Sequence, residues 1–176
     1  MWEIVYQWSL IAIEKHTEKW YERAVRPPWV RLLLKNAEGA ILLTKEYRAE
    51  QGSFDYRLPG GKVFDTLEEY LEIRGNQTAL DTAVLAAAKL EAKEEAGVDQ
   101  IENLRIFHDS HAGASVEWDL YYVSGKILSM SEQNLWGDEL HHGIEVGFYT
   151  TPEVLFMIKN GEIQEDRTVG VLCKYL

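Results

Sequence analysis

A glutamate-rich helix that ends at a glycine constrains this chain more than any other segment. Within residues 90–98, Glu91, Glu94 and Glu95 stand at positions i, i+3 and i+4, so a helix places their carboxylates on one face. Like charges at this spacing repel one another, at a cost of about 0.2–0.5 kcal/mol per pair. Clustered carboxylate oxygens are the ligands that hard divalent ions prefer. The pattern therefore indicates either a metal site or an ordinary solvated charged face.

A glycine turn upstream of this helix favours the metal site. Pro59 fixes its own φ angle, and Gly60 and Gly61 let another group approach the backbone closely. With a net charge of −11, the chain needs metal ions to bind an anionic pyrophosphate, and the same charge disfavours a nucleic-acid partner. A glycine turn followed by an acidic helix suits a site for metal-bound phosphates.

Together the two segments resemble the signature of the Nudix hydrolase family, G-x5-E-x7-R-E-U-x-E-E-x-G-U, in which U is a bulky aliphatic residue. The residues that match the signature are Gly61, Glu91, Glu94, Glu95, Gly97 and Val98. Leu90 occupies the position of the signature arginine, and Thr82 occupies the position of the earlier glutamate. The chain also carries an insertion between Gly61 and the helix. In the family the arginine helps to hold the glutamates by salt bridging, and Lys93 is the candidate to replace it here.

The resemblance implies an α/β fold, a Nudix α/β/α sandwich with a mixed β-sheet in a single domain. Residues 29–176 would form this domain, and residues 1–28 an N-terminal β extension. Residues 29–34 and 40–44 read as two strands joined by a turn at Gly39. The branch discussed next commonly pairs through its N-terminal strands, so the chain is a candidate homodimer. The tryptophans there suit such an interface or equally a monomer core, and they are Trp2, Trp8, Trp20 and Trp29.

Capping patterns mark three helices. Thr66 and Glu69 form a capping-box pattern, which predicts a short helix inside the insertion that stops at Gly75. The long helix is expected to begin within residues 78–81 and to end at Gly97. Its expected buried residues are Leu80, Val84, Leu85 and Ala88. Thr151 and Pro152 predict the N-cap and first residue of another helix, and the resemblance implies a final helix after it.

Tyr47 and Arg48 precede the glycine turn, as in the ADP-ribose and nucleotide-sugar pyrophosphatase branch of the family. This branch implies Mg²⁺-dependent, or Mn²⁺-dependent, hydrolysis of the diphosphate linkage in a nucleoside diphosphate derivative. ADP-ribose or a nucleotide sugar would yield a nucleoside monophosphate and a phosphorylated moiety. The candidates for substrate binding are Arg48, Arg57 and His111, although His111 reads more readily as a surface residue of its loop.

The resemblance also assigns the chemistry of the site. The predicted metal ligands are the carbonyl of Gly60 and the carboxylates of Glu91, Glu94 and Glu95. The branch takes its general base from a loop before the strand predicted at residues 143–149. Glu139 is the predicted base, with Glu94 as a further catalytic residue. The other candidates in that loop are Glu132, Asp138, His141 and His142.

Two other functions remain open. Leu90 and Thr82 favour a catalytically weakened Nudix-fold sensor that binds a nucleotide, and a house-cleaning hydrolase of nucleoside triphosphates is the third hypothesis. Cys173 lies in an apolar run and is expected to be a buried core thiol. No stretch approaches the ~20 apolar residues of a membrane span, so we expect no membrane partner and a cytoplasmic location.

Overall fold

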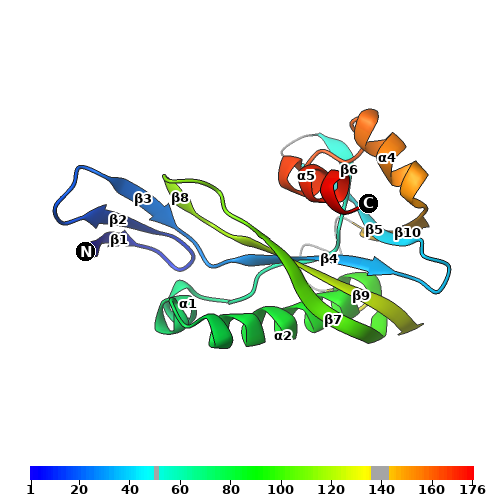
Figure 1. Ribbon diagram of the computed structural model, residues 1–176, viewed down its shortest axis with the longest axis horizontal. Coiled ribbons are helices and arrows are strands. Elements are labelled where there is room, and N and C mark those ends of the chain that lie inside the picture. Colours follow the sequence, from blue (N-terminus) through cyan, green and yellow to red (C-terminus); the bar gives the residue numbers. More distant parts are fainter. Residues whose placement is uncertain (50–51, 136–142) are drawn as a thin grey trace.

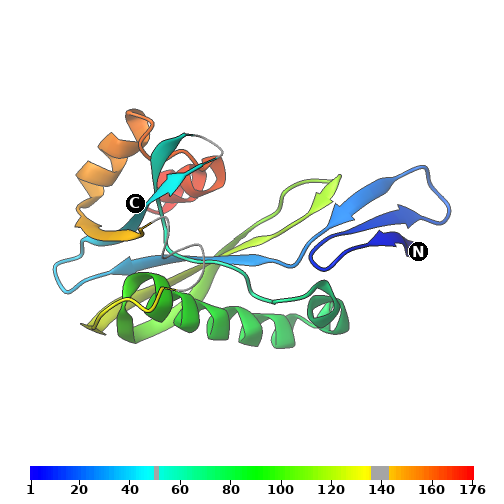
Figure 2. The same cartoon turned by 180° about the vertical axis from the view of Figure 1, so that it is seen from behind.

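The computed structural model describes residues 1–49, 52–135 and 143–176 of the chain. A central sheet lies between two helical layers (Figure 1), and the view from behind shows the same arrangement (Figure 2). The strands of this sheet are β4 (Trp29–Lys35), β5 (Ile41–Arg48), β6 (Ser53–Arg57), β7 (Val98–Ser110), β9 (Leu120–Met130) and β10 (Glu145–Tyr149). The helices are α1 (Leu67–Ile73), α2 (Gln77–Ala96), α4 (Thr151–Lys159) and α5 (Asp166–Tyr175).

The central sheet is mixed, which confirms the predicted α/β sandwich. Its strand order is β10-β5-β4-β9-β7, with β6 also paired to β5. Strands β4 and β9 run parallel, whereas β7 and β9 run antiparallel. The predicted strands of the Gly39 hairpin are both present, but they pair at Lys35 and Ile41 and then diverge. They separate because β4 pairs along its length with β9, while β5 pairs with β6 and β10.

Alternation along the strands builds a core on each face of the sheet. On β4, Val30, Leu32 and Leu34 pack with the buried face of α2, and Leu33 packs with residues of α4 and α5. Successive side chains of a strand point to opposite faces, so a fully buried strand needs apolar residues at nearly every position. Strand β4 meets this requirement except at Arg31, which is 4% exposed, and at Lys35, the partly buried residue at its end. The buried charge of Arg31 becomes important at the site described below.

Local capping explains both helices of the α1–α2 layer. Thr66 and Glu69 form the predicted capping box at the start of α1. Helix α2 begins at Gln77, slightly earlier than predicted, because the side chain of Asn76 accepts a hydrogen bond from the Ala79 N–H. It ends at Gly97, whose φ is 65° and whose Cβ, if it had one, would lie 2.3 Å from the Ser131 carbonyl oxygen. Both conditions require glycine at this position.

A smaller sheet at the N-terminal end contains the predicted strands. It is formed by β1 (Trp2–Gln7), β2 (Ala12–His16), β3 (Glu22–Val25) and β8 (Val116–Glu117), in that order. The carboxylate of Glu14 on β2, 3% exposed, pairs with Arg23 and Arg74, and Arg74 also pairs with Glu117. These ion pairs join α1 to the small sheet. Trp8 and Trp20 are exposed there, and the homodimer remains a prediction.

Two local predictions are wrong. Cys173 is exposed, because the buried face of α5 consists of Thr168, Val171 and Leu172 and leaves Cys173 on the solvent side. Thr150, not Thr151, is the N-cap of α4, and its N–H donates to the Glu153 carboxylate over 2.7 Å. Across the part of the chain that the structure describes, no helix is both long enough and apolar enough to cross a membrane.

Candidate functional site

The glycine turn at residues 58–61 lies against the first half of β4. The Val30 N–H donates to the Gly61 carbonyl and the Leu32 N–H donates to the Pro59 carbonyl, each over 2.9 Å. Gly60 has a φ of 143°, and a Cβ there would lie 2.1 Å from the Val30 carbonyl oxygen. A side chain at residue 60 would therefore break the pairing between the turn and β4.

Two glutamates of α2 reach this turn. The Gly60 N–H donates to Glu95 Oε2 over 2.7 Å. The Glu91 carboxylate lies over Gly61, where a Cβ would come within 2.2 Å of Oε1. The structure thus brings together the two halves of the site that the sequence predicted. Glu94 is half-buried beside them, and its backbone carbonyl accepts a hydrogen bond from the Asn134 N–H over 3.0 Å.

Arg31 holds the turn from the other side, and sequence reasoning missed it. Its Nη1 donates to the Gly60 carbonyl over 2.7 Å, and its Nε lies 3.2 Å from Glu165 Oε2. A buried charge is stable only when it is paired and hydrogen-bonded, so Arg31 must keep both partners. The signal in the sequence was an arginine inside the otherwise apolar run of β4. The Gly60 carbonyl, a predicted metal ligand, therefore already accepts one hydrogen bond and has one lone pair left.

The Arg31–Glu165 pair should make the fold less stable in acid. Burial alone raises the pKa of Glu165, but the charge of Arg31 and hydrogen bonds from Thr168 and Arg31 outweigh it and bring the pKa below its ordinary value of 4.5. A lowered pKa stabilises the folded state above pH 4.5, and this stabilisation is lost as the pH falls through the folded-state pKa. We expect the free energy of unfolding in urea to fall in this range, and to fall less steeply in Glu165→Gln. Identical pH profiles would contradict the assignment.

Leu90 and Thr82, which stand at the positions of the signature arginine and first glutamate, do not contact the glycine turn. Leu90 is 56% exposed, and the Thr82 hydroxyl donates to the Thr78 carbonyl of its own helix over 2.8 Å. Lys93, the candidate substitute for the arginine, forms an ion pair with Asp99 and a hydrogen bond with Ser131. The arginine that contacts the turn therefore comes from β4 rather than from α2.

The predicted substrate-binding residues lie in two different places. Arg57 directly precedes the turn and pairs with Asp55, which is fully buried. Arg48, on the neighbouring strand, pairs with Glu46 over 2.7 Å. Both arginines are therefore partly neutralised by an acidic residue on their own strand.

His111 follows the end of β7, three strands away from the glycine turn. Its neighbour Ser110 pairs with Leu120, Leu120 pairs with Trp29, and Trp29 bridges Lys62 beside the turn, so the row spans about 14 Å. His111 Nδ1 lies 2.8 Å from Asp119, and this hydrogen bond with the charges of Asp119 and Asp109 raises the pKa of the imidazole. Among the described residues, the ion-pair partners of His111 are Asp119 and Asp109, and neither of them belongs to the turn.

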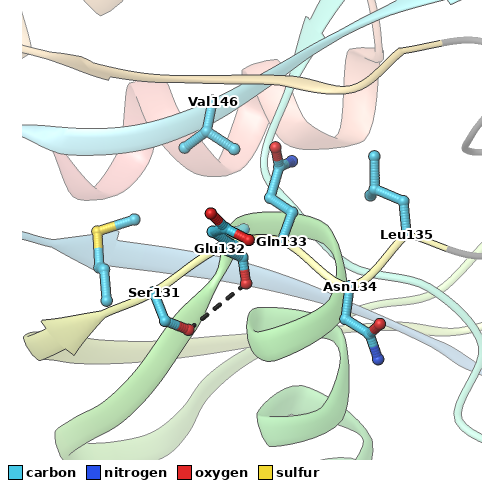
Figure 3. Close-up of a pocket in the computed structure, with 8 residues that line it drawn as sticks. Ser131, Glu132, Gln133, Asn134, Leu135 and Val146 are labelled. Atoms are coloured by element: carbon cyan, nitrogen blue, oxygen red, sulfur yellow. Dashed lines mark hydrogen bonds between the residues drawn. The ribbon is translucent and has the colours of Figure 1, made fainter.

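A cavity of about 510 Å³ opens beside the end of α2. Ala96 lines one wall, residues 130–135 line another, and Val146 of β10 faces them (Figure 3). Gln133 fixes this segment, because its Nε2 donates to the Glu95 carbonyl and, over 3.0 Å, to the Ile144 carbonyl. Glu132 lines the cavity. The predicted base Glu139 lies outside the described residues, and so do Asp138, His141 and His142.

The donor atoms at the turn suit a hard divalent ion. They are carboxylate oxygens of Glu91 and Glu95 and the carbonyl oxygen of Gly60, which match the oxygen ligands of Mg²⁺. Among the residues that the structure describes, no three acidic, histidine or cysteine side chains are grouped as a metal site. A site here would therefore combine side-chain and backbone oxygens.

Comparisons with known proteins address the fold. Neither a scan against models of protein families nor a search of curated proteins finds a match. Among solved structures, the crystal structure of an ADP compounds hydrolase matches with a TM-score of 0.65 and 21% sequence identity, over 98% of this chain and 88% of that chain. A structural match at this low sequence identity establishes the fold but not the activity. The chain therefore shares the mixed α/β fold of an ADP compounds hydrolase.

Proposed function

We propose that this protein is a Mg²⁺-dependent hydrolase of Nudix type, which cleaves the diphosphate linkage of a nucleoside diphosphate derivative. ADP-ribose and nucleotide sugars are the proposed substrates. The products would be a nucleoside monophosphate and a phosphorylated moiety. The similarity of fold to an ADP compounds hydrolase supports this class of substrate.

One observation carries the proposal: Glu91 and Glu95 lie against the Gly60–Gly61 turn. Glu95 accepts the Gly60 N–H over 2.7 Å, and Glu91 occupies the space above Gly61. A solvated charged face would leave these carboxylates pointing into water, with no backbone turn shaped to receive them. The glycines let the carboxylates approach the backbone where a diphosphate and its ion need space.

Glu91 and Glu95 would hold the ion, with Glu94 and the free lone pair of the Gly60 carbonyl as further ligands. When bound, Mg²⁺ neutralises charge on the diphosphate oxygens and lowers the pKa of a water molecule. The protein's own contribution is to fix the carboxylates, through the Gly60 N–H, and to fix the turn, through Arg31. Arg57, next to the turn, would contact phosphate oxygens. Glu139 remains the proposed base.

A substrate panel tests the proposal directly. The panel contains ADP-ribose, nucleoside diphosphate sugars, dinucleoside polyphosphates and nucleoside triphosphates, each with Mg²⁺ and with a chelator. We expect release of a nucleoside monophosphate from ADP-ribose or a nucleotide sugar, and its loss with chelator. Turnover restricted to nucleoside triphosphates would support the house-cleaning hydrolase instead.

Gly61→Ala should lower activity with little loss of stability. A Cβ at residue 61 would meet the Glu91 carboxylate at 2.2 Å, and the end of a flexible side chain can move aside. Displaced from the turn, Glu91 can no longer share an ion with Glu95, so we expect turnover to fall by about tenfold or more. Gly170→Ala is the control, at a glycine of α5 that has no positive φ and that no neighbouring atom crowds. Wild-type turnover in Gly61→Ala would refute the role of Glu91 at the turn.

A nucleotide sensor is the second candidate, and the positions of Leu90 and Thr82 favour it. Leu90 is exposed, and the Thr82 hydroxyl is bonded within its own helix, so neither side chain replaces the function of the family's residue. A sensor would bind ADP-ribose or a nucleotide sugar with Mg²⁺ and release no product. Calorimetric binding without turnover across the whole panel would establish it.

A further inference from the structure

A second cavity, of about 1240 Å³, is lined by residues of β4, β7 and β9 and of the turn after β4. Figure 1 shows that this turn lies at the end of the central sheet that is remote from the small sheet. Lys35, Arg105 and Lys126 line it, together with Phe107 and Tyr175. None of its lining residues is acidic, although the chain has 29 Asp and Glu residues against 18 Lys and Arg. The wall of this cavity therefore has the opposite charge to the protein as a whole.

Strand register places the three cations on one face of three neighbouring strands. Lys35 of β4 stands directly beside Lys126 of β9 in the parallel ladder, and Arg105 of β7 pairs with Ser124, two residues before Lys126. Adjacent strands lie about 4.8 Å apart, and like charges directly opposite one another destabilise a sheet. The sheet therefore holds positive charge at a density that an anion would relieve.

The three cations keep their charge available to a ligand. In the described part of the chain, no ion pair involves Lys35, Arg105 or Lys126, whereas most other arginines there are paired. Glu102 is the cross-strand partner of Lys126 on β7, but it does not line the cavity, and the ion pairs of the described residues do not join it to that lysine.

Aromatic rings form another part of the wall. Phe107 and Tyr175 pack edge to face with ring centroids 4.9 Å apart, and Tyr175 brings the end of α5 over the sheet. Leu33, next to Lys35 on the same sheet face, packs with α5, whereas α2 covers the opposite face. The cavity is therefore separate from the turn that receives Glu91 and Glu95.

We propose that this cavity binds a nucleoside monophosphate, with its phosphate on Lys35, Lys126 and Arg105 and its base against Phe107 and Tyr175. Lysine and arginine are the usual donors to phosphate oxygens, and aromatic faces accept any base by stacking. The site does not depend on the proposed hydrolysis. It serves as a second nucleotide site on the face of the sheet opposite α2.

Binding of AMP to the full chain, with a chelator present, tests the site without a contribution from bound metal. We expect saturable changes in the ¹H–¹⁵N amide shifts of Lys35, Arg105, Phe107 and Lys126, and weaker binding at higher salt. Lys126→Ala should raise the Kd by roughly tenfold, because one charge-assisted contact is lost. Glu102→Gln should lower the Kd, because it removes the nearest cross-strand acid.

Matched controls separate this site from others. Lys159→Ala removes an exposed lysine from α4 and should leave the Kd unchanged, as should Glu95→Gln at the glycine turn. Equal Kd values for Lys126→Ala and Lys159→Ala, or shifts confined to the glycine turn, would overturn the proposal. Inorganic phosphate should bind more weakly than AMP, and equal affinity would overturn the contact with the base. Lys126 is exposed, so its replacement leaves the fold intact, and circular dichroism confirms this.

Discussion

Glu95→Gln is expected to lower turnover by about 10²-fold or more and to leave the fold intact. The glutamine carbonyl can still accept the hydrogen bond that the Gly60 N–H now donates over 2.7 Å, so the turn keeps its position. The substitution removes the negative charge with which Glu95 would hold Mg²⁺. Steady-state kinetics on the best substrate of the panel, with thermal unfolding of both proteins, measure the two effects separately.

Glu72→Gln is the matched control for this prediction. Glu72 is an exposed glutamate of α1, outside the glycine turn, and we expect wild-type turnover and stability for this variant. If Glu95→Gln and Glu72→Gln are equally active, the metal-site assignment at the turn is wrong. If the wild-type protein shows no turnover, and Glu95→Gln binds the ligand as the wild-type protein does, the sensor function is supported.

Arg31→Met is expected to destabilise the protein by about 3–5 kcal/mol, the usual result of breaking a buried ion pair by removing one partner. Arg31 is 4% exposed and the side chain of Glu165 is 17% exposed, so the substitution leaves a largely buried carboxylate without its cation. The Gly60 carbonyl also loses its donor at 2.7 Å. Urea denaturation gives the change in free energy of unfolding.

Two further variants separate the loss of the ion pair from the loss of the arginine's bulk. Arg31→Met combined with Glu165→Gln should recover part of the stability, because no buried charge is then left unpaired. Arg105→Met, at an exposed arginine of β7, should change the free energy of unfolding by about 0.5 kcal/mol or less. A loss in Arg31→Met no larger than that in Arg105→Met would show that the pair with Glu165 does not stabilise the fold.

Local signals predicted the elements whose causes are themselves local. The Thr66–Glu69 capping box and the Gly97 stop define α1 and the end of α2, because a cap depends on side chains within one helical turn. The run of residues 29–34 predicted the strand β4, because strand propensity also depends on residues adjacent in sequence. The N-cap of α4 was misplaced by one residue because Thr150 and Thr151 are equally good caps in sequence.

Long-range partners explain the features that the sequence did not reveal. The divergence of β4 and β5 and the exposure of Cys173 each depend on which elements pack together. Lys93 was the expected substitute for the missing signature arginine because it is near in sequence, yet it pairs with Asp99. The position of Lys93 on α2 gave no information that an arginine of β4 contacts the glycine turn.

The sequence by itself determined that three carboxylates share one face of a helix and that a glycine turn precedes that helix, because helical periodicity and glycine geometry are local properties. Only the tertiary structure decided that Glu91 and Glu95 meet this turn, and that Arg31 and Glu165 hold it from the opposite side. Arg31 and Glu165 lie 134 residues apart in the chain. Contacts over such separations form only when the sheet and its two helical layers assemble, so no local pattern records them.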